Sequence, residues 1–130
     1  MTTKNFDDWS DEKTDIHYHK ERPFFHVREV WFCVMGANIG FEQDGRGENF
    51  LRPIVVIRKF NNEVLWALPL TTKTKTGKYY FSFKLDGAND SVAILSQLRL
   101  IDAKRLQYKL GVMRGADFEQ LKTKIRQLLA

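Results

Sequence analysis

Three histidines and a single cysteine are the side chains of this 130-residue chain that most readily suggest metal binding or nucleophilic chemistry. His17, His19 and His26 all precede the first strand-like segment. His17 and His19 could face the same way and bind a metal ion, but no Cys or carboxylate completes a ligand set, which favours exposed side chains. Cys33 lies inside an apolar run without a neighbouring histidine, which predicts a buried structural thiol rather than a nucleophile.

A glycine-containing loop at residues 36–49 is the other feature that could bind a small molecule. Gly36 and Gly40 are not followed by Gly-Lys-Ser/Thr or by a predicted helix, so the loop does not read as a phosphate-binding loop. The chain also lacks the Gly-x-Ser-x-Gly pattern of a serine nucleophile. An enzyme built on this sequence is therefore expected to work without a metal ion, a histidine triad or an organic cofactor.

Composition limits the class of protein. A mass of 15.3 kDa with 43% hydrophobic residues is typical of one soluble globular domain. The 10 Phe, 3 Trp and 4 Tyr exclude a wholly disordered chain, and one cysteine excludes a disulfide framework. No apolar run approaches about 18 residues, which excludes a membrane span. The first residues lack the apolar stretch of a signal peptide, so we expect a cytoplasmic protein.

Charge is unevenly distributed along the chain, whose net charge is +5. Residues 1–25 hold 4 basic and 6 acidic residues, and residues 26–130 hold 17 basic and 10 acidic ones. A basic domain suits a polyanion such as nucleic acid, although a solvated basic surface would give the same balance.

Residues 1–25 are expected to form an acidic N-terminal extension with a helix. Asn5 can cap this helix, and four side chains share one face at helical spacing: Phe6, Trp9, Lys13 and Ile16. Residues 26–130 form the second unit, in which β-branched and aromatic runs predict a series of short strands. The expected strands are residues 27–35, 51–60, 64–70, 78–85, 91–95, 98–101 and 108–113.

Two helical segments are expected among and after these strands. Asp102 can cap a single turn at residues 103–106. Residues 115–129 predict an amphipathic helix with Phe118, Leu121, Ile125 and Leu128 on one face. The expected fold is therefore mainly β with α, a compact barrel or sandwich with an appended helix.

Four segments in a fixed order make the sequence specific. They are EVWF at residues 29–32 leading to NIGFEQ at 38–43, LRPIVVI at 51–57, ALPLT at 67–71, and SVAILSQLRLIDAKRL at 91–106. Together they closely resemble the MazF/PemK toxins of type II toxin–antitoxin systems, over roughly residues 27–129.

This resemblance implies a fold and an activity. The fold is a small SH3-like β barrel of the MazF/CcdB kind with a C-terminal helix, assembled as a homodimer. The activity is metal-independent, sequence-specific cleavage of single-stranded RNA, which inhibits growth. A cognate antitoxin is the expected protein partner, and operator DNA a further one for the toxin–antitoxin complex.

The resemblance also implies that Arg52 and Thr71 are the catalytic residues. RNA carries its own nucleophile in the 2′-OH, so the protein must mainly position the chain and stabilise charge on the phosphate. A guanidinium can donate two N–H bonds to a phosphate, and a hydroxyl can donate another. Without the resemblance, Arg52 would be read as a surface charge and Thr71 as a residue chosen for β-propensity.

RNA-binding residues are expected in the loop at residues 36–49. Phe41 could stack on a base, while Glu42 and Gln43 could read base edges. Alternatively, Phe41 packs in the core and Glu42 pairs with an arginine. Some family members have a histidine before the Glu-Gln pair, so the general base is left unassigned, with Glu42 as a candidate.

Further RNA contacts are expected after residue 71 and in the fourth segment. Lys73 and Lys75 could steer the RNA backbone or simply keep an edge strand soluble. Ser96, Gln97 and Arg99 belong to the most recurrent stretch of the family, and Arg99 and Asp102 are expected to serve mainly as an ion pair or a cap.

Ser96 stands where some members have an acidic residue. The alternative function is therefore a non-catalytic nucleic-acid-binding or gyrase-poison-like protein on the same fold.

Overall fold

The computed structural model describes residues 21–35, 51–85 and 90–130. The expected N-terminal helix and the loop at residues 36–49 lie outside the described residues. The described elements are β1 (Glu29–Val34), β2 (Leu51–Lys59), β3 (Val64–Thr71), β4 (Tyr80–Lys84), β5 (Asp90–Ile94), η1 (Leu95–Gln97), β6 (Arg99–Asp102), η2 (Ala103–Arg105), β7 (Leu106–Val112) and α2 (Gly115–Leu129). None of these helices is long and apolar enough to cross a membrane.

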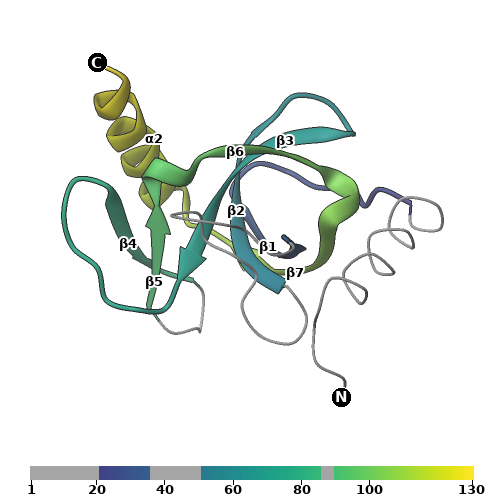
Figure 1. The fold of residues 1–130 in the computed structure, drawn as a ribbon, viewed down its shortest axis with the longest axis horizontal. Coiled ribbons are helices and arrows are strands. Elements are labelled where there is room, and N and C mark those ends of the chain that lie inside the picture. Colours follow the sequence, from purple (N-terminus) through teal and green to yellow (C-terminus); the bar gives the residue numbers. More distant parts are fainter. Residues whose placement is uncertain (1–20, 36–50, 86–89) are drawn as a thin grey trace.

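The strands form one antiparallel seven-stranded sheet in the order β4-β5-β3-β2-β1-β7, with β6 paired to β3 (Figure 1). β3 has two partners on one edge, because Val64–Ala67 pair with β6 and Leu70–Thr71 pair with β5. The chain turns between those partners through η1, a 3-10 turn that the sequence pattern did not predict. The sheet is not closed, so the expected barrel is an open, curled sheet.

Hydrophobic side chains cover both faces of β1, β2 and β3. Val30, Val55 and Leu68 lie in one core cluster, whereas Trp31 and Ile54, one position along, lie in the other. The segment from β6 through η2 to β7 passes from the β3 edge to the β1 edge beside the second cluster. Because both faces are buried, these strands read as nearly continuous apolar runs rather than alternating ones.

α2 covers the first cluster, as its amphipathic pattern predicts. Phe118 and Leu121 are buried there, and Ile125 and Leu128 pack against it. β4 lies at the sheet edge, and its side chains alternate, with Phe81 and Phe83 buried and Ser82 and Lys84 exposed.

The chain before β1 is attached to the sheet at several points. Phe25 is fully buried in the second cluster, and the Lys59 ammonium lies 4.7 Å from the centre of its ring. Lys59 Nζ also donates a hydrogen bond to the Phe25 carbonyl at 2.9 Å. Phe25 therefore anchors this segment to the sheet.

Candidate functional site

Arg52 and Thr71 lie where β2 and β3 part from each other. The last pair between these strands at this end is Ile54 with Pro69. Two residues further on each strand, Arg52 pairs with Cys33 of β1, while Thr71 pairs with Val92 of β5. The two strands separate at this point (Figure 1). The side chains of Arg52 and Thr71 are half-buried and project from the face of the sheet that carries the second core cluster.

Arg99 joins them on the same face. It is the first residue of β6 and lies opposite Ala67, a member of the second cluster. Since β6 runs antiparallel to β3, its start lies toward the Thr71 end of that strand. Gln97 directly precedes this point in η1 and is half-buried, whereas Ser96 is exposed.

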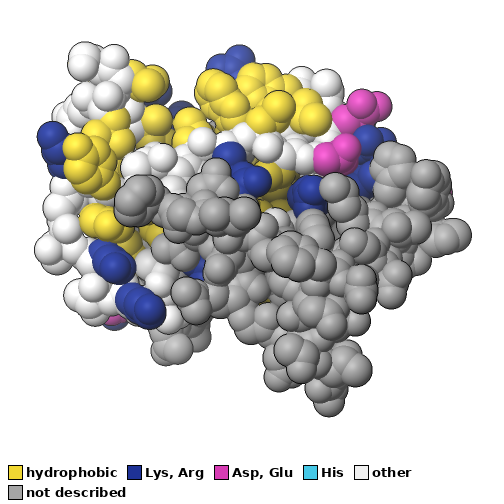
Figure 2. Space-filling model, in the orientation of Figure 1, with side chains coloured by type: hydrophobic (Ala, Val, Ile, Leu, Met, Phe, Trp, Pro, Cys, Tyr) yellow, Lys and Arg dark blue, Asp and Glu magenta, His cyan; other side chains and the backbone are white. Residues whose placement is uncertain are grey.

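Arg105 reaches the same end of the sheet from η2. Its Nη1 donates a hydrogen bond to the carbonyl of Val34, the last residue of β1, at 3.2 Å. The following residue, Leu106, pairs with Cys33. In Figure 2, some of the Lys and Arg side chains lie near the middle of the view, beside the residues drawn in grey.

The pKa of the Cys33 thiol reflects both burial and positive charge at this end of the sheet. Burial raises its pKa to about 12, against a weaker lowering by the positive charges of Arg105 and Arg99. The thiol is fully buried, as the sequence predicts, and it lies opposite Arg52 in the sheet. The Nε of Arg52 is itself out of contact with solvent. Arg99 and Arg105 thus act on the thiol of a residue whose partner in the sheet is Arg52, and positive charge of this kind suits an anionic ligand.

Thr71 also shapes the segment that follows it. Its Oγ1 accepts a hydrogen bond from the backbone N–H of Lys73 at 3.2 Å. Accepting this bond leaves the hydroxyl proton able to donate. Lys73 and Lys75 are both exposed in the segment between β3 and β4, so the structure keeps them accessible to solvent near the end of β3.

Asp102 has the structural role that the sequence predicts. Its Oδ1 accepts from the backbone N–H of Lys104 at 2.8 Å and caps η2. Its two oxygens also receive the Arg22 guanidinium, at 3.1 and 3.0 Å. Burial alone would raise the pKa of Asp102, but the hydrogen bonds from Arg22 and Lys104 lower it overall. The ion pair is made with Arg22, from the segment before β1, rather than with Arg99.

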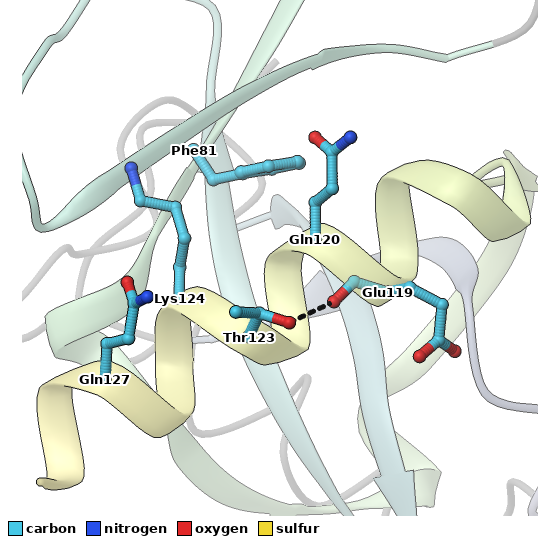
Figure 3. Close-up of a pocket in the computed structure, with 6 residues that line it drawn as sticks. All are labelled: Phe81, Glu119, Gln120, Thr123, Lys124 and Gln127. Atoms are coloured by element: carbon cyan, nitrogen blue, oxygen red, sulfur yellow. Dashed lines mark hydrogen bonds between the residues drawn. The ribbon is translucent and has the colours of Figure 1, made fainter.

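A hollow of about 370 Å³ lies elsewhere, between β4 and α2 (Figure 3). It is lined by Phe81, Glu119, Gln120, Thr123, Lys124 and Gln127. The Thr123 hydroxyl donates to the Glu119 carbonyl at 3.0 Å, and Lys124 Nζ donates to the Tyr80 carbonyl at 3.2 Å. The Lys124 bond joins α2 to β4, whereas the Thr123 bond lies within the helix. The predicted site residues do not line this hollow.

A comparison with models of known protein families shows which family this chain belongs to. Residues 27–129 match the model of the PemK-like, MazF-like toxins of type II toxin–antitoxin systems. The chain belongs to this toxin family. None of the curated proteins compared with it matches its sequence.

Solved structures show that the PemK/MazF-like fold is shared. An endoribonuclease in complex with its cognate antitoxin, from a mycobacterial species, has a TM-score of 0.62 at 14% identity, over 82% of this chain and 95% of its own. MazF from Deinococcus radiodurans has a TM-score of 0.62 at 15% identity, over 81% of this chain and 96% of its own. The Mycobacterium tuberculosis toxin MazF-mt6 has a TM-score of 0.60 at 13% identity, over 78% of this chain and 96% of its own.

The structure brings some of the predicted residues of this toxin together at one end of the sheet. Phe41, Glu42 and Gln43 lie outside the described residues, and the other predicted residues that lie close in the fold are Arg52, Thr71, Gln97 and Arg99. Arg105 was not singled out. A signal was available, since Asp102 predicts a short capped turn and a basic pair ends it, but the direction of the Arg105 side chain depends on the β1–β7 register.

Proposed function

We propose that this toxin is an endoribonuclease that cuts single-stranded RNA at specific sequences, without a metal ion, and thereby inhibits growth. The observation that carries the proposal is the placement of Arg52 and Thr71 on one face, at the point where β2 and β3 separate. A cationic group and a hydroxyl at a strand separation can approach a phosphodiester from two sides. Membership of the toxin family supports the same reading.

The proposed reaction uses the nucleophile that RNA supplies. The 2′-oxygen forms a bond to the adjacent phosphorus, and the bond from phosphorus to the 5′-oxygen breaks. A base takes the 2′-OH proton and the departing 5′-oxygen gains one. Glu42, the candidate base, lies outside the described residues.

Arg52 and Thr71 have distinct roles in this reaction. Arg52 donates two N–H bonds to the non-bridging oxygens, where negative charge grows in the transition state. Its guanidinium cannot lose its proton, so it acts by charge rather than by proton transfer. Thr71 donates to a phosphate oxygen or orients the 2′-OH. The half-buried position of Arg52, on a strand paired with β1, limits the reorganisation that binding requires.

The proposed partners follow from the same site. Single-stranded RNA is the substrate, and a cognate antitoxin with an acidic segment would cover the basic face. Of the proteins similar in fold, the mycobacterial endoribonuclease was solved with its cognate antitoxin, and MazF from Deinococcus radiodurans was solved together with MazE. We also propose a homodimer that acts in the cytoplasm and binds operator DNA together with the antitoxin.

Cleavage in the presence of EDTA tests the proposal. The wild-type protein should cut single-stranded RNA at defined positions when the product ends are mapped. Arg52→Ala and Thr71→Ala should each lower the rate by about 10²–10³, the usual cost of losing one such donor. Arg126→Ala, on the exposed side of α2, is the charge-matched control and should cut at the wild-type rate.

Equal cleavage by wild type and Arg52→Ala would contradict the assignment of Arg52. RNA binding by the wild type without cleavage would instead identify a non-catalytic nucleic-acid-binding protein. Gyrase inhibition without RNA cleavage would identify a gyrase-poison-like toxin.

A further inference from the structure

Three exposed apolar side chains lie together toward the β2–β3 hairpin, away from the point where those strands separate. They are Phe60, Trp66 and Leu100, which are 43%, 38% and 57% exposed, and we call them the hairpin patch. Trp66 of β3 pairs with Leu100 of β6, and the Phe60 N–H donates to the Val64 carbonyl at 3.2 Å. Because paired residues of antiparallel strands project from the same face, the three side chains share one face.

The hairpin patch is an ordered aromatic surface. The Phe60 and Trp66 rings meet edge to face with their centres 5.0 Å apart, and the Arg58 guanidinium lies 5.3 Å from the centre of the Phe60 ring. In Figure 2, hydrophobic side chains gather near the top of the view, where Figure 1 draws β3 and β6. Exposed apolar side chains that lie together in this way are typical of an interaction surface.

The described chain begins close to this patch. Both carboxylate oxygens of Asp102 accept from the Arg22 guanidinium, at 3.1 and 3.0 Å. Asp102 lies two residues beyond Leu100 in β6, which is about 7 Å along the strand on the same face. The six residues from Ile16 to Arg22 can span about 20 Å when extended. The segment that precedes Glu21 is therefore within reach of the patch.

Residues 1–20 lie outside the described residues, but their sequence has the chemistry that the patch requires. Phe6, Trp9 and Ile16 share one face of the expected helix. Five carboxylates lie off that face, at Asp7, Asp8, Asp11, Glu12 and Asp15. A helix of about 12 residues is marginal in water unless its apolar face packs against a surface.

We propose that residues 5–16 dock as a helix on the hairpin patch of the same chain, with their apolar face against its three side chains. The docked helix turns its carboxylates toward solvent and covers apolar surface that would otherwise favour association. The patch lies at the other end of the sheet from Arg52 and Thr71, so docking there is separate from the proposed cleavage.

Hydrogen exchange of the full chain tests the proposal, with mass spectrometry of the peptides that cover residues 5–16. These amides should exchange at least about tenfold more slowly than in a synthetic peptide of residues 1–20, because docking is needed to hold so short a helix. Leu100→Asp and Phe60→Asp should each return exchange to the rate of the peptide. Leu129→Asp adds the same charge at an 81% exposed position of α2 and should keep the wild-type rate.

Substitutions in the segment itself keep the test decisive if a patch variant fails to fold. Ile16→Asp places a charge on the apolar face of the expected helix and should return exchange to the rate of the peptide. Thr14→Asp adds the same charge off that face and should leave exchange slow. Melting temperatures show whether each variant is folded.

Three results would overturn the proposal. Wild-type amides that exchange at the rate of the peptide would mean that the segment does not dock. A folded Leu100→Asp protein with unchanged slow exchange would place the docked segment on another surface. Docking within one chain is independent of protein concentration, so slow exchange that is lost on tenfold dilution would assign the patch to the segment of a second copy.

Discussion

Cys33 shows how strongly a single side chain is controlled by its surroundings. It is the only cysteine of the chain, is fully buried, and lies opposite Arg52. Arginine charges near a thiol ordinarily favour the thiolate, yet here burial outweighs them and the pKa rises to about 12. Cys33 therefore contributes packing rather than reactivity.

Thiol labelling tests this assignment. At pH 8 the folded protein should react with a disulfide reagent at least about 100-fold more slowly than the urea-unfolded protein, because the thiolate is the reactive form. The time course is followed by absorbance, with the unfolded chain as the control. Labelling of the native protein as fast as the unfolded one would show that the thiol is accessible and ionised.

The candidate site was only partly predictable at the residue scale. Arg52 and Thr71 were found through a motif resemblance, since an Arg-Pro pair and a terminal threonine carry little signal alone. Their shared face depends on the β2–β3 register and on where that ladder ends, which no local pattern encodes. Arg105 depends on a register shift between β1 and β7, so its approach to Val34 emerges only in three dimensions.

At the scale of elements, β1 is joined to its neighbours by a buried carboxylate at its first residue. Glu29 Oε1 accepts from the His26 N–H at 2.9 Å and from Trp31 Nε1 at 3.0 Å. Lys109 Nζ, from β7, lies 3.3 Å from Oε2. Burial alone would raise the pKa of Glu29, but the bonds from Trp31, His26 and Lys109 together lower it.

This arrangement predicts a pH-dependent contribution to stability. A lowered pKa in the folded state means that the contribution is complete above the unfolded pKa of about 4.5 and is lost as the pH falls through the folded value. Glu29→Gln should lower the free energy of unfolding by about 1–3 kcal/mol at pH 7. The difference from wild type should shrink below pH of about 4.5 in urea titrations.

Glu119→Gln is the control for Glu29, because Glu119 is an exposed carboxylate on α2. It should change the free energy of unfolding by less than about 0.5 kcal/mol. A Glu29→Gln difference that stays constant from pH 7 to 3, or grows as the pH falls, would contradict the role of the carboxylate.

Element types were more predictable than their assembly. The sequence of β4 has the two-residue period of a strand, and that of α2 has the period of about 3.6 residues of a helix. β1 is buried on both faces, because residues of β6, η2 and β7 pack in the second cluster. Closure into a barrel was expected, but β4 and β7 remain at the two ends of the strand order, and strand order is set by long-range pairing.

At the scale of the whole molecule, two hydrophobic clusters share one set of strands. Val30 and Val55 face the first cluster, and Trp31 and Ile54 face the second, on the same two strands. Neither cluster can lose its packing without disturbing strands that the other needs. We therefore expect one cooperative unfolding transition, as is usual for a domain of this size.

Leu121→Ala tests that coupling from the first cluster. Leu121 is fully buried where α2 covers the sheet, so its truncation should cost about 2–5 kcal/mol. Leu129→Ala, at a position 81% exposed in the same helix, should change stability by less than about 0.5 kcal/mol. Circular dichroism reports α2, and Trp31 fluorescence reports the second cluster, although Trp9 and Trp66 also contribute to the signal. If the clusters are coupled, both signals should shift together to lower denaturant in Leu121→Ala. Early loss of the helical signal, with fluorescence unchanged, would mean that α2 unfolds separately and that the two clusters are independent.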